Sequence, residues 1–221
     1  MNWTRLRNFL WMDTRFHFLS KIPRGGSLLD IGTSDGQTLN HFREARPDLQ
    51  LHATDIEGKP DSYPSGTQFF RGDITSDSLP WMDASMDAIS CMHLVEHITD
   101  FNNLFTECNR LLKKGGSLYI ETPHPKTLYL SMPYAAQAGK FTYNFYDDLT
   151  HQQIMPLGKI AALAVPFGFT PVRVGTSRNW LFALLFPFSF LLPVRQRIIS
   201  RVHFIGWSAF IVLRKNETPA S

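Results

Sequence analysis

Short apolar runs alternate with amphipathic segments along the first 121 residues of the chain. The runs lie at residues 28–31, 49–54, 69–71, 86–92 and 117–121. Between them, apolar positions recur at helical spacing. The segment containing Leu104, Phe105 and Leu111 ends at two lysines and two glycines, which is typical of a helix C-terminus. Strands that alternate with helices predict βαβ units, right-handed crossovers and a mainly parallel sheet.

The first run continues into a glycine turn, in the sequence LLDIGTSDG from Leu28 to Gly36. Gly32 permits a close approach of backbone to a ligand or a positive φ, and Gly36 lets the next helix pack tightly on the sheet. Asp30 places an acceptor near the end of the strand. A turn of this kind alone is a weak indication of a nucleotide site.

Acidic or polar residues also follow the later runs. Asp55 comes about twenty residues after the glycine turn, where a carboxylate can accept from both hydroxyls of a ribose. Ile74, directly after Asp73, could flank a planar base. Ligands of such sheets bind beyond the carboxyl ends of the strands. We therefore expect one crevice to be shared by side chains from five elements: Asp30, Asp55, Asp73, His93 and Glu121.

This succession resembles the class I S-adenosylmethionine-dependent methyltransferases, in particular the small-molecule branch with type 11 and type 23 domains. The resemblance rests on the Leu-Asp-Ile-Gly turn, on Glu96-His97 after the fourth strand and on the Leu-Lys-Lys-Gly-Gly turn at 112–116, and it covers about residues 25–175. It implies a Rossmann-like α/β fold: a doubly wound, seven-stranded, mainly parallel sheet with an antiparallel last strand and helices on both faces. It also implies S-adenosyl-L-methionine as the cofactor.

In that family, the backbone around Gly32 to Gly36 faces the methionine part of the cofactor. The residue matching Asp55 binds the ribose, and those matching Asp73 and Ile74 hold adenine. The sequence departs from the family at Ser34, where a second glycine is usual. The predicted cofactor-binding residues are Asp30, Gly32, Thr33, Gly36, Asp55, Ile56, Asp73, Ile74, His93 and His97.

The length of 221 residues predicts a single domain. Its expected parts are a helical leader (1–22), a cofactor-binding core (23–121), an acceptor-pocket insertion (122–150), an apolar and basic insertion (178–205) and a last strand (206–215). The leader either closes over the cofactor or packs on the edge of the sheet. The insertion after Glu121 is rich in Tyr and Phe, which suit an apolar acceptor or a small core, and Pro123 and Pro125 predict a loop rather than an immediate helix.

A net charge of +3 is only mildly basic, so no nucleic-acid partner is expected. Cys91 and Cys108 lie outside any Cys-x-x-Cys pattern, which predicts reduced, buried thiols rather than a disulfide or a cysteine zinc site. Polar residues interrupt the apolar positions near the N-terminus, so we expect no export signal and a cytoplasmic protein that can also lie at the inner face of a membrane.

Methyl transfer to oxygen usually needs a base to remove the acceptor's proton, and histidine suits that task. His151, in a Leu-Thr-His run similar to the Gly-Thr-His run of quinone O-methyltransferases, and His124, after the fifth strand, are the candidates. Either could instead be structural. The predicted acceptor is a small molecule or a lipid- or glycan-linked group, methylated at oxygen, and no metal is predicted. Glu96 and His97 are expected either to form a local hydrogen-bonding pair near the cofactor or, as the resemblance implies for some relatives, to bind an accessory divalent ion.

Three other functions compete with this one. His93-x-x-Glu96-His97 also spells an inverted zincin motif, which would make the protein a zinc hydrolase, although His93 directly follows a strand rather than lying on a helix. A non-catalytic cofactor-binding scaffold is the second. A dehydrogenase is the third, but it requires a Gly-x-Gly-x-x-Gly fingerprint that the turn does not supply.

The segment 180–194 contains no charged residue and is flanked by arginines on both sides. It is shorter than a membrane span and contains Pro187 and Pro193, which excludes a transmembrane helix. Two interpretations stay open for residues 180–201: an element lying in a membrane interface, or a buried hairpin or dimer contact. The oligomeric state is not predicted.

Overall fold

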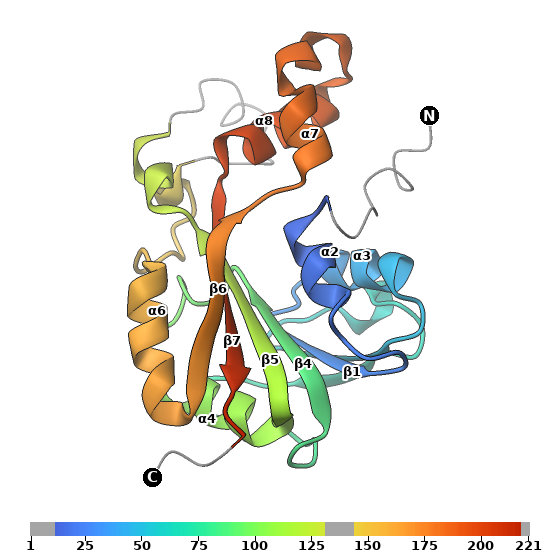
Figure 1. Cartoon of the computed structure of the whole chain (residues 1–221), viewed down its shortest axis with the longest axis vertical. Coiled ribbons are helices and arrows are strands. Elements are labelled where there is room, and N and C mark those ends of the chain that lie inside the picture. Colours follow the sequence, from blue (N-terminus) through green and yellow to red (C-terminus); the bar gives the residue numbers. More distant parts are fainter. Residues whose placement is uncertain (1–11, 131–143, 218–221) are drawn as a thin grey trace.

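The computed structural model of the chain describes residues 12–130 and 144–217. Its centre is a seven-stranded sheet in the order β3-β2-β1-β4-β5-β7-β6 (Figure 1). The strands are β1 (Ser27–Ile31), β2 (Gln50–Asp55), β3 (Gln68–Arg71), β4 (Met86–Met92), β5 (Leu112–Pro123), β6 (Phe169–Ser177) and β7 (Ser208–Lys215). The first five strands are parallel, and β7 pairs antiparallel with both β5 and β6. The predicted fold class is confirmed.

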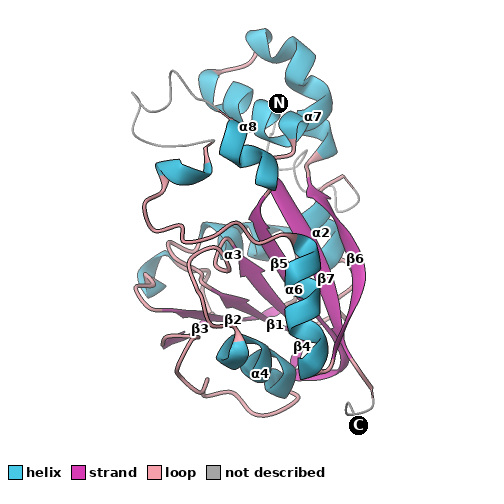
Figure 2. Cartoon of the chain, turned by 90° about the vertical axis from the view of Figure 1, so that its left-hand side faces the viewer, coloured by secondary structure: helices cyan, strands magenta, loops and turns pink. Residues whose placement is uncertain are grey.

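Helices cover both faces of this sheet (Figure 2). On one face lie α2 (Thr14–Leu19) and α3 (Gln37–Ala45), and on the other α4 (Asn102–Leu111) and α6 (Leu157–Ala164). Alternate residues of a strand serve opposite cores: Tyr119 packs with α2 and α3, whereas its neighbours Leu118 and Ile120 pack with α4 and α6. Because both faces are covered, the central strands are buried almost continuously, which explains their unbroken apolar runs.

Two insertions leave the sheet at the carboxyl ends of its parallel strands. Pro123 at the end of β5 and Ser177 at the end of β6 both pair with Ser208 at the start of β7. The first insertion holds the 3-10 helices η2 (Pro125–Tyr129) and η3 (Phe145–Asp147), and the second holds α7 (Trp180–Leu185), η5 (Phe186–Leu191) and α8 (Val194–Ile205). The remaining short elements are η1 (Pro60–Ser62) and η4 (Val165–Phe167). Both insertions therefore flank one edge of the sheet.

Two local predictions are wrong. The fifth strand, predicted at 117–121, spans Leu112–Pro123, because Met86 pairs with Leu112 before a bulge in the ladder. The predicted loop also contains a short helix, which begins at Pro125. A proline is tolerated at the first position of a helix because the backbone N–H that it lacks would have no partner within the helix.

The described part of the leader packs on the sheet. Asp13 caps α2 by accepting from the backbone amides of Arg15 and Phe16, and Phe16, Phe18 and Leu19 are buried in the core shared with α3. Residues 1–11 of the predicted leader, which include the apolar residues Trp3, Leu6 and Leu10, lie outside the described residues. Cys91 and Cys108 are free thiols, and both are buried, as predicted.

Candidate active site

The glycine turn after β1 has the backbone conformation that its sequence predicts. Gly32 and Gly36 have φ angles of 77° and 76°, in the left-handed region that favours glycine. A Cβ on Gly36 would lie 2.3 Å from Cδ1 of Tyr63, so only glycine fits there. Ser34 also has a positive φ, of 51°. The position where the sequence departs from the family thus keeps the backbone conformation that a glycine would adopt.

An open pocket of about 140 Å³ lies beside this turn. Its walls come from the carboxyl ends of β1, β2 and β3 and from the turn that follows β4. They are Ile31, Gly32, Thr54, Asp55, Ile56, Gly72, Asp73, Ile74, Leu94 and Ile98. Five of the predicted cofactor residues are in this set: Gly32, Asp55, Ile56, Asp73 and Ile74. Sequence reasoning missed Leu94 and Ile98, which are ordinary apolar residues without a motif of their own.

The two acidic side chains of the pocket are held in place by backbone amides. Asp55 Oδ2 accepts from the amide of Ser34 at 2.7 Å, and its Oδ1 accepts from the amide of Glu57 at 2.7 Å. Asp73 Oδ1 accepts from the amide and the hydroxyl of Thr75. These carboxylates are therefore oriented before any ligand binds, and the first of them ties the end of β2 to the glycine turn.

Three other predicted residues, Asp30, Thr33 and Gly36, do not line the pocket but support the turn. Asp30 is buried and accepts from the Ser90 hydroxyl at 2.6 Å, and burial raises the pKa of its carboxyl to about 7. The Thr33 hydroxyl donates to the carbonyl of Asp30, and Gly36 is the N-cap of α3. The expectation that Asp30 points its acceptor into the crevice is thus not met, because its oxygen binds β4 instead.

His93 lies between two buried carboxylates at the ends of β4 and β5. Its Nδ1 is 3.1 Å from Glu96 Oε1 and its Nε2 is 3.5 Å from Glu121 Oε1. Burial alone would lower the pKa of His93, but its hydrogen bonds to Glu121 and Glu96 raise it to about 9. His93 is therefore an imidazolium at neutral pH. It does not line the pocket, although the sequence placed it among the cofactor-binding residues.

Glu121 has a second cationic partner, Arg15 of α2. The Arg15 guanidinium donates to both carboxylate oxygens of Glu121, and the Tyr119 hydroxyl donates to the same carboxylate. Burial alone would raise the pKa of Glu121, but Arg15 and His93 hold it well below its usual range. Sequence reasoning missed Arg15, because nothing in the pattern distinguishes it from the other arginines near the N-terminus.

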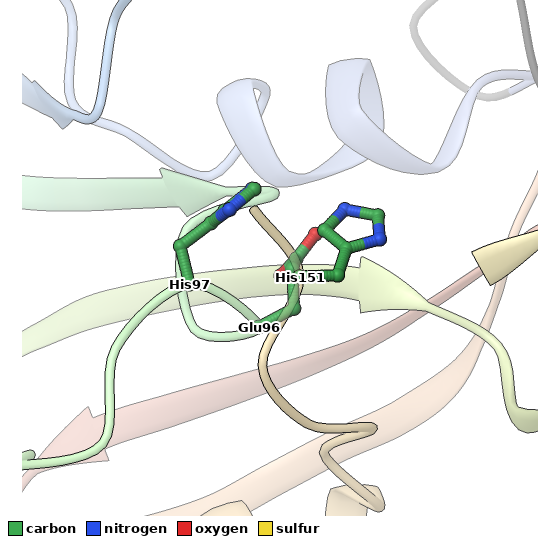
Figure 3. Close-up of side chains that lie close together, drawn as sticks. All are labelled: Glu96, His97 and His151. Atoms are coloured by element: carbon green, nitrogen blue, oxygen red, sulfur yellow. The ribbon is translucent and has the colours of Figure 1, made fainter. Parts of the chain in front are cut away.

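Glu96, His97 and His151 form a cluster next to the pocket, shown in Figure 3. Glu96 and His97 come from the turn after β4, whose Leu94 and Ile98 line the pocket. One ligand atom from each of the three lies within 4.8 Å of the others, a spacing at which the three groups could hold one divalent cation. The prediction that Glu96 and His97 bond to each other is wrong. Glu96 bonds to His93 and Thr122, and His97 bonds to Thr150.

The hydrogen bonds of the two histidines in this cluster define their tautomers. His151 Nδ1 lies 2.7 Å from the carbonyl of Phe145, which can only accept, so Nδ1 carries the proton. The Thr150 hydroxyl donates to Asp148 and therefore accepts from His97 Nδ1. With one proton on each ring, Nε2 keeps its lone pair, and Nε2 of His151 lies 3.7 Å from Asp148 Oδ2. Such a nitrogen can take up a proton or bind a cation.

His124, the second predicted base, uses its lone pair in the fold. It is the N-cap of η2, and its Nδ1 accepts from the amide of Lys126 at 3.1 Å. Burial, together with the charges of Lys126 and Arg178, lowers the pKa of His124. It is thus a weaker base than an ordinary histidine, and its free ring nitrogen carries the proton.

The geometry that a zinc hydrolase would need is missing from residues 93–97. His93 has a φ of 53° and follows β4 directly, and residues 95–97 form a turn rather than a helix. His93 and His97 therefore do not sit one helical turn apart, and His93 is engaged by two carboxylates. The zinc-hydrolase alternative is excluded on this geometry.

Residues 3–174 match the model of a protein family described as a methyltransferase domain. A ubiquinone biosynthesis O-methyltransferase of Xylella fastidiosa is 32% identical over 149 residues, which are 62% of this chain and 58% of that protein. A protein of the same name from Xanthomonas axonopodis pv. citri is 31% identical over 107 residues, 45% of this chain and 44% of that one. The chain thus spans about half the length of the curated relatives it matches. The crystal structure of a SAM dependent methyltransferase from Archaeoglobus fulgidus has the same fold, with a TM-score of 0.61 over 94% of each chain at 19% identity.

Proposed function

Since the chain belongs to the class I S-adenosylmethionine-dependent methyltransferase family, we propose that it transfers the methyl group of S-adenosyl-L-methionine to a hydroxyl oxygen of a small molecule or of a lipid- or glycan-linked acceptor. The cofactor supplies an electrophilic methyl group. The residues of the pocket fit this cofactor: Gly32 lines the pocket without a side chain, and Asp55 offers two oriented oxygens to a pair of ribose hydroxyls.

The observation that carries the choice of oxygen is the tautomer of His151. Its Nδ1 proton is held by the Phe145 carbonyl, so its Nε2 can accept a proton from an acceptor hydroxyl. The ring packs on Phe145 and lies 4.8 Å from that of His97, whose turn also lines the pocket. Both relatives described above carry the name O-methyltransferase, which is in keeping with this chemistry. Methyl transfer itself is an in-line displacement, in which positioning supplies most of the acceleration.

Cofactor binding is tested most directly at Asp55. We expect Asp55→Ala to weaken the affinity for S-adenosylhomocysteine by about 1.5–3 kcal/mol, roughly 10- to 150-fold, since hydrogen bonds to a charged group are lost. Isothermal titration calorimetry measures the change. Asp61→Ala, an exposed carboxylate of η1 outside the pocket lining, is the matched control and should bind as the unaltered protein does.

Unaltered affinity in Asp55→Ala would remove this residue from the ribose site. Asp55 also caps the turn through Ser34 and Glu57, so a thermal melt of the variant must accompany the titration. If the unaltered protein fails to bind S-adenosylmethionine and S-adenosylhomocysteine, the proposed function is refuted.

The acceptor can be found without guessing it. The purified protein is incubated with labelled S-adenosylmethionine and a lipid and metabolite extract of cells that lack the gene, and labelled products are identified by mass spectrometry. We expect a methyl ether. Label on nitrogen or carbon would overturn the assignment to oxygen. Cofactor binding with no labelled product would favour the non-catalytic scaffold.

A further inference from the structure

We propose that the α7–α8 hairpin (residues 178–205) docks the protein on the surface of an anionic phospholipid bilayer. The hairpin, made of α7, η5 and α8, projects beyond the carboxyl edge of the sheet at the top of Figure 1. Within residues 12–130 and 144–217, it contacts the rest of the chain mainly through its base, residues 178–180 and 203–205.

The first observation is the apolar surface of the hairpin. Six large hydrophobic side chains in it are between 49% and 73% exposed. They are Trp180, Leu184, Phe188, Phe190, Leu191 and Phe204. Single exposed hydrophobic residues are common on any protein, but a group of this size on one projecting element marks an interaction site.

The second observation is charge, which selects the partner. Residues 178–205 contain four arginines and no Asp or Glu. Arg197 donates to the carbonyls of Phe190 and Leu192, and the Arg178 guanidinium lies 5.7 Å from the centre of the Trp180 ring. Cations are thus fixed beside the exposed apolar side chains. That arrangement complements a bilayer surface, where phosphates lie directly above acyl chains.

Burial lowers the pKa of His203, the fifth basic residue of the hairpin, to about 4. His203 is therefore neutral at physiological pH, and its Nδ1 accepts from the amide of Asn179. The titratable and charged groups that lie around it are Arg15, Arg178 and Glu121. The attraction to lipid phosphate consequently comes from the arginines, and it should not depend on pH near neutrality.

The hairpin suits a position in the interface rather than across the membrane. Among the described residues, no helix is both long enough and apolar enough to span a bilayer. Pro187 is the second residue of η5 and Pro193 precedes α8, so the apolar run is broken into short helices. Elements of this kind lie at the level of the lipid headgroups with their apolar side chains inserted.

The base of the hairpin is tied to the start of α2 and to η2. The Asn179 side chain donates to Asp13, the Trp180 amide donates to the carbonyl of Met12, and Lys126 donates to the carbonyl of Ile205. The hairpin and the insertion after β5 leave the same edge of the sheet. Docking would therefore turn this edge toward the bilayer. Resting on the proposed function, this favours an acceptor with an apolar tail.

Co-sedimentation with vesicles tests the docking without cofactor or acceptor, so its failure is distinct from failure of the proposed function. We expect the protein to pellet with phosphatidylcholine–phosphatidylglycerol vesicles, to stay in solution with phosphatidylcholine alone, and to be released by salt. Phe188→Ser/Phe190→Ser should weaken binding about tenfold or more. Arg197→Gln/Arg201→Gln should weaken it about 30-fold, since each arginine contributes about 1 kcal/mol.

Matched controls separate this effect from general surface changes. Val172→Ser/Val174→Ser removes two exposed apolar side chains from β6, outside the hairpin, and should leave binding unchanged. Arg197→Lys keeps the charge and should retain most of the binding. No pelleting at low salt, or equal pelleting with neutral vesicles, overturns the proposal. A third result also overturns it: the protein is a dimer in sedimentation velocity, and Phe188→Ser/Phe190→Ser makes it a monomer without changing vesicle binding. The apolar surface of the hairpin would then join two copies of the chain.

Discussion

We expect His151→Ala to lower the rate of methyl transfer by about 10²- to 10⁴-fold while leaving the affinity for S-adenosylhomocysteine nearly unchanged. The variant removes the Nε2 lone pair that the Phe145 carbonyl leaves available by holding the Nδ1 proton. His151 does not line the pocket, so cofactor binding should not depend on it. The rate is measured as S-adenosylhomocysteine formed with the acceptor identified from the extract.

His124→Ala is the matched control for this prediction. It removes a histidine from the neighbouring insertion whose lone pair caps η2, so it should lower thermal stability with only a small effect on the rate per folded molecule. If His124→Ala loses activity and His151→Ala does not, the assignment of the base is reversed.

A chelator distinguishes a base from a metal ligand at His151. If His151 acts as a base alone, EDTA leaves the rate unchanged, and His151→Ala responds to added Mg²⁺, Mn²⁺ or Zn²⁺ no more than the unaltered protein does. If EDTA abolishes the activity and a divalent cation restores it, Glu96, His97 and His151 act together as ligands. In that case His97→Ala should be as damaging as His151→Ala.

The sequence predicts the sheet and the pocket because both depend on local signals. Apolar runs followed by glycine or aspartate mark the carboxyl ends of strands, and parallel strands bring those ends together. Asp55 and Asp73 accordingly line the same pocket although they lie in separate elements. Leu94 and Ile98 complete that pocket through packing, which has no periodic signature in a short turn.

Side-chain partners over long sequence distances are the part that the sequence could not supply. Glu96 and His97 are neighbours in the chain, yet each bonds elsewhere, since their side chains leave the turn in different directions. Arg15 and Glu121 are separated by 106 positions and meet only because α2 packs on the sheet face beside β5. The apolar run at 180–194 predicted either burial or exposure, and only the tertiary fold decides between them.

The pairing of Arg15 with Glu121 leads to a prediction about stability. We expect Glu121→Gln to lower the free energy of unfolding by about 3 kcal/mol, because it leaves a partly buried guanidinium and the His93 imidazolium without their shared counter-charge. Urea denaturation measures the loss. A double-mutant cycle with Arg15→Gln isolates the pair, and its coupling energy should lie at about 0.5–3 kcal/mol.

The same variant should change how stability depends on pH. The pKa of His93 is raised to about 9 from an ordinary value of 6.5, so its charge stabilises the fold fully below pH 6.5, and this contribution is lost as the pH rises through about 9. Glu121→Gln removes one of the two carboxylates that raise this pKa, so the fall in stability over that interval should become smaller.

Glu107→Gln is the matched control. It removes a buried carboxylate whose partner Arg110 does not titrate in this pH interval, so it should destabilise the protein while keeping the full pH dependence. A Glu121→Gln variant with the stability and pH profile of the unaltered protein would mean that Arg15 and His93 are hydrated in solution and that the network does not hold α2 to the sheet.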